Sequence, residues 1–571
     1  MQVVIKQCVE KAVEEVFPEV SEMPGFDVLV PPRAELGDYS ANIAMILAKT
    51  LKRNPMEIAE AIAGELEKEE IFERVEAAPP GYVNMTLSGK VFEEMLAKII
   101  EKGALYGGNE KFSGKNILVE YTDPNPFKVF HIGHLMTNVI GESIARLYEA
   151  SGADVKRCVY QGDVGMHVAK SLWGAWKIKD ELPERSASGE VFAEFFGKAY
   201  VLGSSAYEED PSAQKEMQEI NAKVYDRSDE QINELYDLGR EKTLEHFEKI
   251  YQILGTKFDY YFFESKTAVR GMELVERGLQ EGIFEESDGA IVYAKEGDGL
   301  HTRVFRNAKG LPTYEAKDLG LIEEKRQVAG ENVNLSLVIT ANEQSAYFRV
   351  VLAAARELLG KAAENTRHIG YGMMRLATGK MGSRKGNVIS GESLLLDTID
   401  RAKTKVGSKD IDDVLREEIA RKVGVGAIKY AILKQSIGKD IVFNPEESLS
   451  LEGNSGPYVQ YALIRAKSVL KKAEDISRAG GVDRKDNEGR GVEALLLRYP
   501  DVVEEACTKQ FPHLVGEFVF SLAQEFNAFY AKHSIAQGGE SAPYRLAMTQ
   551  SVAVVLEHAL SLLGISAPEK M

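Results

Sequence analysis

The sequence predicts an α/β fold: a Rossmann-like parallel-sheet domain with a helical insertion, an α+β domain before it and an all-helical domain after it. Residues 116–122 and 153–160 are short apolar runs typical of strands, and residues 135–150 between them carry apolar side chains at helical spacing. Strands that alternate with helices build parallel sheets. After residue 386 the chain has helical periodicity almost throughout, which predicts the final helical part.

The first 110 residues are predicted to form a separable α+β unit. We expect helices over residues 3–16 and 43–51, and an acidic helix over residues 57–76. Residues 81–85 have the pattern of a strand. From the residues alone, this unit could equally serve as a dimerisation module.

The parallel-sheet domain is expected over residues 111–390. A helical pattern from about residue 170 to residue 288 indicates an insertion in it. The strand-like residues 290–293 and 335–340 are then expected to rebuild the parallel sheet. In open sheets of this kind, ligands bind at the carboxyl ends of the strands where the strand order reverses.

The rest of the chain is predicted to be helical. Residues 391–453 form a connecting region, with a polar linker at residues 405–413 and a helix over residues 414–435. Residues 454–571 form the last domain, in which residues 480–491 are a polar, glycine-rich loop between helices.

The composition of the 571 residues excludes several classes of protein. The three cysteines, Cys8, Cys158 and Cys507, are too scattered for a disulfide framework or a zinc site, so we expect no protein-bound structural metal. No apolar run approaches the ~18 residues of a membrane span, and charges in the first helix exclude a secretory signal. We therefore expect a cytoplasmic protein. The formal net charge of −18 argues against an RNA partner, although nucleic-acid binding depends on local basic patches.

Two histidines in one turn are the most informative local feature. His131 and His134 flank Gly133 where the first strand pattern gives way to a helix. Helix N-termini attract phosphate, Gly133 lets the backbone approach a ligand, and imidazoles can donate hydrogen bonds to phosphoryl oxygens. No dinucleotide or P-loop fingerprint is present. The alternative is a turn and a helix cap without chemistry.

A basic loop between glycines lies far downstream, at residues 379–386. Taken alone, such a segment is most often a solvated loop. Together with the histidines, and with residues 368–374 ahead of it, the loop is predicted to bind the triphosphate of ATP.

These motifs resemble those of the class I aminoacyl-tRNA synthetases, and of the arginyl-tRNA synthetases in particular. Residues 119–121, Pro124, Asn125 and Lys128 precede residues 131–134 in the order of that family. The resemblance covers nearly the whole chain. It implies that the N-terminal unit contacts tRNA and that the last domain binds the anticodon.

The chain departs from the usual motifs at three positions. Ser383 stands where most class I enzymes have a second lysine, but arginyl enzymes commonly lack that lysine and have one at the position of Lys128. Gly382 replaces a serine, and Val164 stands where tryptophan is frequent. The first departure favours the arginyl family.

The resemblance implies ATP-dependent ligation of L-arginine to the 3′-terminal adenosine of its tRNA. The arginine carboxylate attacks the α-phosphorus of ATP, and the 2′-hydroxyl of the tRNA then attacks the resulting arginyl-adenylate. Neither step needs a protein nucleophile, so positioning and charge stabilisation are expected to dominate. Mg²⁺ is expected to accompany ATP. Activation is expected to require bound tRNA, and the protein is expected to be a monomer.

The resemblance also assigns residues to each ligand. The catalytic candidates are Lys128, His131, His134 and Lys380. The ATP-binding candidates are His131, Gly133, His134, Gly372, Met373, Lys380, Ser383 and Lys385. The arginine-binding candidates are Glu120, Asn125, Tyr314, Asp318 and Gln344, and the tRNA-binding candidates are Tyr458, Gln460, Tyr461 and Arg465.

Physical chemistry supports part of this assignment. A planar guanidinium pairs best with carboxylates, which suits Glu120 and Asp318. Tyr314 and Asp318 share a face if their segment is helical. Taken alone, Tyr314 would be an ordinary half-buried aromatic and Asp318 a surface charge. Tyr461 and Arg465, also four residues apart, could simply brace their own helix.

Two other functions remain open at this stage. The first is an RNA-binding protein on a synthetase scaffold that no longer activates an amino acid. The presence of Lys128, His131, His134 and Lys380 argues against it. The second is a related nucleotidyl-transfer enzyme acting on another small acid, which the carboxylates and the helical last domain argue against.

Overall fold

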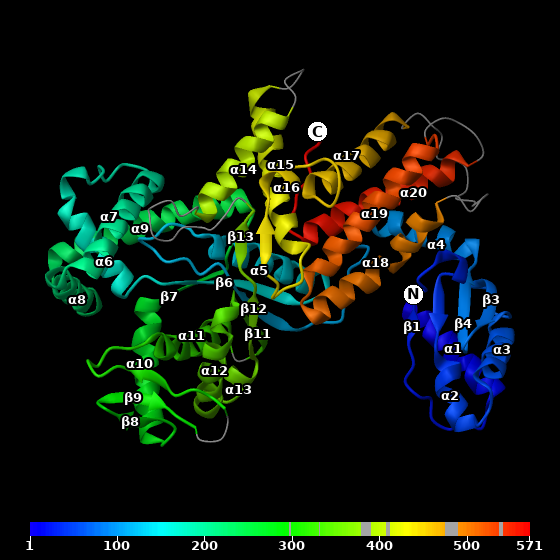
Figure 1. The fold of residues 1–571 in the computed structure, drawn as a ribbon, viewed down its shortest axis with the longest axis horizontal. Coiled ribbons are helices and arrows are strands. Elements are labelled where there is room, and N and C mark those ends of the chain that lie inside the picture. Colours follow the sequence, from blue (N-terminus) through cyan, green and yellow to red (C-terminus); the bar gives the residue numbers. More distant parts are fainter. Residues whose placement is uncertain (296–298, 331, 378–389, 407–411, 474–488, 536–540) are drawn as a thin grey trace. The chain divides into compact units, whose positions relative to one another are not determined.

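The computed structural model describes residues 1–295, 299–330, 332–377, 390–406, 412–473, 489–535 and 541–571 (Figure 1). The chain divides into two compact units. One contains residues 1–108, 461–505 and 517–559, and the other contains residues 109–460, 506–516 and 560–571. The described helices include none that is long and apolar enough to cross a membrane.

A five-stranded parallel sheet is the centre of the second unit. Its strands, in spatial order, are β12 (Thr366–Tyr371), β11 (Val333–Ala341), β5 (Asn116–Glu120), β6 (Asp154–Gln161) and β7 (Tyr260–Phe263). Every neighbouring pair is parallel. The order reverses between β5 and β11, since β5 is followed along the chain by β6 on one side and β11 lies on the other. The predicted parallel sheet and its switch point are confirmed.

Helices pack on both faces of this sheet. On one face, α5 (Ile132–Ala150) packs on β5, β6 and β11, and Gly141 allows it to approach the Tyr121 ring. On the other face, Leu321 of α11 (Tyr314–Ala329) packs with Leu118, Cys158 and Phe262. Because side chains alternate along a strand, Glu120 points to the same face as Leu118.

The helical insertion is shorter than predicted. It consists of α6 (Met166–Lys177), α7 (Gly189–Glu209), α8 (Pro211–Asp226) and α9 (Glu230–Leu254), which cluster at the teal end of Figure 1. The stretch up to residue 288 was expected to be helical, but β7 lies inside it. The short, aromatic β7 pairs with β6 and buries Phe262, and this pairing overrides the helical spacing around it.

Residues 290–293 also differ from expectation. They form β9 (Ala290–Tyr293), which is a strand but not part of the parallel sheet. It pairs antiparallel with β8 (Glu285–Ser287) and β10 (Arg303–Arg306). Its Ile291 and Tyr293 belong to an apolar core that includes residues of α10 (Glu264–Gln280) and α12 (Ser345–Leu359). A short helix, α13 (Lys361–Glu364), then leads into β12.

Helices follow β12, as predicted. The described helices are α14 (Gly391–Lys405), α15 (Asp413–Leu433), α16 (Pro445–Ser448), α17 (Gly456–Lys472), α18 (Arg490–Lys509), α19 (Pro512–Lys532) and α20 (Ala542–Leu562). Two short strands, β13 (Met374–Leu376) before α14 and β14 (Ile441–Phe443) after α15, pair in parallel. The predicted linker at residues 405–413 and loop at residues 480–491 lie largely outside the described residues. The four-part division of the chain stays a prediction.

The N-terminal part of the first unit is α+β, as predicted. Its antiparallel sheet has the order β1 (Val28–Leu29), β2 (Tyr39–Ala41), β4 (Tyr82–Leu87) and β3 (Phe72–Ala78). Its helices are α1 (Gln2–Val16), α2 (Ile43–Leu51), α3 (Pro55–Leu66) and α4 (Gly89–Lys102). The helix predicted up to residue 76 ends earlier, because Phe72 and Val75 are buried in β3 instead.

A buried carboxylate ties the insertion to the carboxyl end of the sheet. Asp163, which follows β6, is fully buried. Its oxygens accept hydrogen bonds from the Ser265 N–H (2.8 Å) and hydroxyl (2.8 Å), the Arg240 Nε (2.9 Å) and the Tyr236 hydroxyl (3.2 Å). Ser265 lies in the first turn of α10, whereas Arg240 and Tyr236 lie on α9.

We therefore expect Asp163→Ala to destabilise this unit by about 3–5 kcal/mol, because it leaves a partly buried Arg240 without its counter-ion. The matched control is Asp237→Ala, which removes an exposed ion pair between Asp237 and Arg227 in the same helical region. Calorimetric thermal midpoints would compare the two variants. Equal shifts would contradict a special role for Asp163.

Candidate active site

The candidate site lies at the carboxyl ends of the parallel strands, beside the switch point. The segment between β5 and α5 crosses this edge, and three non-glycine residues in it have positive φ: Thr122, Asp123 and Phe127. Such conformations cost energy and persist only where the surroundings hold them. The Tyr160 N–H donates to Asp123 Oδ1 (2.8 Å), and the fully buried Phe127 packs against Phe196 and Tyr236.

The two histidines of the first motif cap each other. The His134 N–H donates to His131 Nδ1 (3.3 Å), and the His131 N–H donates to His134 Nδ1 (3.2 Å), which makes a reciprocal capping box at the start of α5. The rings are stacked with centroids 3.3 Å apart. Because each Nδ1 accepts a hydrogen bond, the proton of each neutral imidazole is on Nε2. Each ring therefore presents an Nε2–H donor.

Both imidazoles are neutral at physiological pH. Desolvation and then the charge of Lys128 lower the pKa of His131 to about 4. Burial, His131 and Lys128 lower the pKa of His134 well below its usual value. The pair thus combines two hydrogen-bond donors without adding formal charge.

Gly133 fits this arrangement sterically. A Cβ on Gly133 would meet the His131 ring and the Tyr371 hydroxyl. Tyr371, buried at the end of β12, donates from that hydroxyl to the Gly133 carbonyl (3.4 Å). This hydrogen bond connects the end of β12 to the start of α5, across the switch point. Tyr371 was not among the predicted site residues.

The helix that follows the second motif begins beside the first motif. Lys380, Ser383 and Lys385 lie outside the described residues. The helix that follows, α14, begins against the histidine segment, since the Gly391 N–H donates to the Phe130 carbonyl (2.8 Å). A Cβ on Gly391 would meet the His131 backbone.

Lys128 lies on the approach to the histidines. Its ammonium is 4.9 Å from the centroid of the Tyr200 ring, on α7 of the insertion. This is within the range of a cation–π interaction. The site therefore has a cation next to its two neutral donors.

Gly372 and Met373 follow β12 at the same edge. Gly372 is buried against the Lys439 backbone, where a side chain would collide. The exposed Met373 donates its N–H to Asp440 Oδ1 (2.9 Å). The backbone is thus held close to residues 439–441, with the Met373 side chain outward.

Several predicted arginine-binding residues lie along this edge. Asn125 lies against Gly162, which has no room for a Cβ beside the Asn125 amide oxygen. Tyr314 and Asp318 are one turn apart on α11, as predicted, with Tyr314 61 % exposed. Gln344 is exposed just before α12.

Asp318 has a perturbed carboxyl group. Its Oδ2 accepts a hydrogen bond from the Tyr347 hydroxyl (2.6 Å). Desolvation raises the pKa of Asp318 to about 7, with Glu120 and Glu264 adding to the rise and Tyr347 opposing it. A carboxyl group whose pKa is strongly shifted, at the carboxyl ends of the parallel strands, is a typical functional-site candidate.

Glu120 and its neighbour Glu264 already have cations. Glu120 is buried and pairs with the buried Lys325 of α11. Glu264 is buried and accepts from Lys317 Nζ (2.6 Å). Neither lysine was among the predicted site residues, although the seven-residue spacing from Asp318 to Lys325 puts both on one face of a helix.

The predicted tRNA-binding residues have different environments. In the first unit, the Arg465 guanidinium lies 4.7 Å from the Tyr461 ring centroid and 5.0 Å from that of Tyr530, and donates to Asn527 Oδ1 (2.5 Å). Tyr461 and Arg465 therefore contact each other on their own helix. In the second unit, Tyr458 is partly buried at the start of α17.

Gln460 requires a correction. Its side chain is fully buried, and its amide nitrogen donates to the Lys422 carbonyl (3.0 Å) and the Ser566 carbonyl (2.7 Å). It holds two parts of its own unit together and has no exposed surface to offer tRNA.

No group of three or more His, Cys, Asp or Glu side chains among the described residues is placed to hold a metal ion. The acidic side chains at the edge are instead hydrogen-bonded or paired with lysines. An ion at this edge would need ligands from another source, such as phosphate oxygens and water.

Three family models match successive parts of the chain. Residues 95–445 match the catalytic domain of the class I (R) tRNA synthetases, residues 3–87 the arginyl tRNA synthetase N-terminal domain, and residues 459–571 the DALR anticodon binding domain. The first match alone spans more than half of the chain.

Curated relatives and solved structures agree with the models. The chain is 32 % identical to an arginine–tRNA ligase of Clostridium kluyveri over 95 % of each chain, and 31 % identical to one of Streptococcus thermophilus over 99 % of this chain and all of the other. The arginyl-tRNA synthetase of Thermus thermophilus aligns over both full chains with a TM-score of 0.81 and 25 % identity. An enzyme of the same name from Plasmodium falciparum, at 22 % identity, shares the fold with a TM-score of 0.79. The chain belongs to the arginyl-tRNA synthetase family of class I aminoacyl-tRNA synthetases.

Proposed function

We propose that the edge built by residues 120–134, 314–318 and 371–373 activates arginine with ATP and transfers it to tRNA. The chain ligates L-arginine to tRNA through an arginyl-adenylate. The observation that carries the assignment of residues is the reciprocally capped pair His131 and His134, whose two Nε2–H donors stand at a helix N-terminus beside the switch point.

In the first step, the arginine carboxylate attacks the α-phosphorus of ATP and pyrophosphate leaves. His131 and His134 donate hydrogen bonds to phosphoryl oxygens as negative charge moves onto them. Lys128 and Lys380 neutralise the charge of the departing pyrophosphate. Mg²⁺ is bound mainly by phosphate oxygens and water and supplies further charge neutralisation. Gly372 and Met373 support the adenine, and Ser383 and Lys385 contact the phosphates.

Arginine is recognised through its guanidinium and its α-amino group. Asp318 is the main partner of the guanidinium because its carboxyl group has a phenol rather than a lysine as its hydrogen-bond partner. Tyr314 lies one helical turn away on the same helix. Asn125 and Gln344 bind the polar atoms of the amino acid. Glu120, at the carboxyl end of β5, contributes to the arginine pocket as a carboxylate already paired with Lys325.

In the second step, the 2′-hydroxyl of the terminal adenosine attacks the activated carbonyl. Tyr458 and the pair Tyr461 and Arg465 stack on unpaired tRNA bases. Activation requires bound tRNA, and the protein acts as a cytoplasmic monomer.

ATP–pyrophosphate exchange, measured with each amino acid in turn and with or without total tRNA, tests this function. We expect exchange with arginine alone, and only when tRNA is present. Exchange with another amino acid would move the specificity away from Asp318. Folded protein without exchange under any condition would overturn the proposed activity.

Isosteric substitutions separate the two nitrogens of His134. His134→Asn keeps an oxygen near Nδ1 for the cap and removes the Nε2–H donor, whereas His134→Gln restores a donor near Nε2. We expect His134→Asn to lower kcat for exchange by roughly 100–1000-fold, the effect of one lost transition-state donor. His134→Gln should lower kcat for exchange by a smaller factor. A larger loss in His134→Gln would show that the cap matters more than the donor.

The raised pKa of Asp318 predicts how arginine binding depends on pH. With a pKa of about 7, Asp318 is mostly ionised at pH 8 and mostly protonated at pH 6. Only the ionised form pairs with the guanidinium, so the Kd for arginine should rise about tenfold as the pH falls over this range. The histidines, already neutral, do not titrate there.

Calorimetry of arginine binding from pH 6 to pH 8 would measure this dependence. Asp318→Asn should bind arginine weakly at every pH. Tyr347→Phe removes the hydrogen bond that lowers the pKa of Asp318. This variant should therefore shift the midpoint of the pH dependence of arginine binding to higher pH. A flat profile in the unsubstituted protein would exclude Asp318 as the titrating partner.

A further inference from the structure

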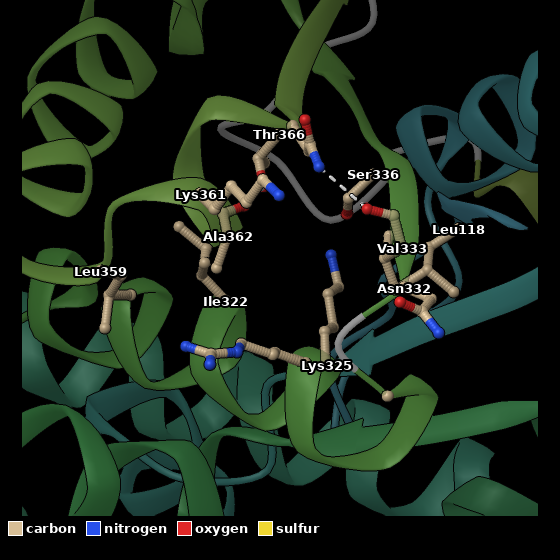
Figure 2. Close-up of a pocket in the computed structure, with 13 residues that line it drawn as sticks. Leu118, Ile322, Lys325, Asn332, Val333, Ser336, Leu359, Lys361, Ala362 and Thr366 are labelled. Carbon is tan, nitrogen blue, oxygen red and sulfur yellow. Dashed lines mark hydrogen bonds between the residues drawn. The ribbon is translucent and has the colours of Figure 1, made fainter.

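A second cavity lies on the α11 face of the parallel sheet, away from the histidines. It has a volume of about 390 Å³ and is lined by residues of α11, the end of α12, α13 and strands β5, β11 and β12 (Figure 2). This volume is roughly that of a dozen liquid waters and is within the usual range of small-molecule sites. All of its lining residues belong to the second unit.

One wall of the cavity is polar and positively charged. Lys325 extends into the hollow with its ammonium toward Ser336 (Figure 2). The Ser336 hydroxyl is buried and has no hydrogen-bond partner among the residues that the structure describes. Arg326 and Lys361 also line the cavity, and no carboxylate does so among the described residues.

The other wall is apolar. It is made by Leu118, Ile322, Val333, Leu359 and Ala362. A free inorganic ion would use only the polar wall. A cavity with cationic groups on one side and aliphatic side chains on the other suits an organic anion with an apolar body.

We propose that this cavity binds a small organic phosphate, whose phosphoryl group lies between Ser336, Lys325 and Lys361 and whose apolar body packs on Leu359 and Ala362. Lysines and a hydroxyl are suitable partners for a dianionic phosphoryl group. The unpartnered Ser336 hydroxyl gains an acceptor, which removes the cost of leaving it buried and unbonded.

Lys325 connects this cavity to the arginine pocket. The same ammonium that lines the cavity is the counter-ion of Glu120, at the carboxyl end of β5. An anion in the cavity competes with Glu120 for Lys325 and makes the arginine pocket more negative. Binding of the anion and of the arginine cation is therefore positively coupled, and by linkage each tightens the other.

Direct binding of phenyl phosphate to the full chain tests the site. The matched probes are phenol, which has the apolar body without the charge, inorganic phosphate, which has the charge without the body, and benzoate, which replaces the phosphoryl group by a carboxylate. We expect calorimetry to give a Kd below about 1 mM for phenyl phosphate and at least tenfold weaker binding of the other three. Equal binding of any of the three, or no saturable binding of phenyl phosphate, would overturn the proposal.

Substitutions locate the bound probe. Ala362→Met fills the cavity and should abolish binding, and Ser336→Ala, which changes its shape little, should weaken binding about fivefold. Lys361→Ala should weaken binding at least as much, whereas its control Lys215→Ala, on the exposed face of α8, should not. His131→Asn should bind phenyl phosphate normally. If His131→Asn lost phenyl phosphate binding and Ala362→Met kept it, the probe would lie in the ATP site and the proposal would be overturned.

The coupling is tested separately, and this arm alone rests on the proposed arginine pocket. Phenyl phosphate at saturation should lower the Kd of arginine about fivefold, and Ala362→Met should abolish this effect. An unchanged or higher Kd with the cavity demonstrably filled would overturn the coupling through Lys325 while leaving the binding site itself in place.

Discussion

The reciprocal hydrogen bonds between His131 and His134 are the constraint on which the site depends. Each backbone N–H caps the other ring at Nδ1, so one pair of contacts starts helix α5, sets both tautomers and directs both Nε2–H groups away from the backbone. Gly133 and Gly391 have no side chain because the rings and backbone of this turn occupy that space. Low pKa values keep the pair neutral. The turn therefore presents two neutral donors at a helix N-terminus, which supports our proposal that they bind phosphate without a proton change during the reaction.

Charge balance distinguishes the carboxylates at the edge of the sheet. Burying an ionised carboxyl group is costly unless it is paired. Glu120 and Glu264 have Lys325 and Lys317, whereas the direct hydrogen-bond partner of Asp318 is a tyrosine, which leaves its pKa raised. A substrate that brings its own cation completes the pairing. We propose that arginine is selected in this way by Asp318, whose direct hydrogen-bond partner is a tyrosine and not a cation.

Much of this could be predicted from the sequence, because periodicity and short motifs are local. The strand–helix–strand unit around α5, the capped turn with its histidines, and the pairing of Tyr314 with Asp318 on one helix face all follow from spacing. The errors concern non-local pairing. Residues 72–78 and 260–263 form strands because they pair with neighbouring strands, and β9 pairs within an antiparallel sheet. Gln460 is buried within its own unit, and the ion pair of Lys325 with Glu120 depends on a helix that packs on a sheet. No local pattern reports either contact.

The proposed role of the turn requires that His131 and His134 are neutral and carry their protons on Nε2. Nitrogen-15 chemical shifts of the two imidazoles, in protein labelled at histidine and assigned with the single His→Asn variants, measure this directly. The account predicts an unprotonated Nδ1 and a protonated Nε2 in both rings, unchanged from pH 8 to about pH 5.5, given a pKa of about 4 for His131. A protonated Nδ1 in either ring, or titration near the ordinary histidine pKa of about 6.5, would contradict it.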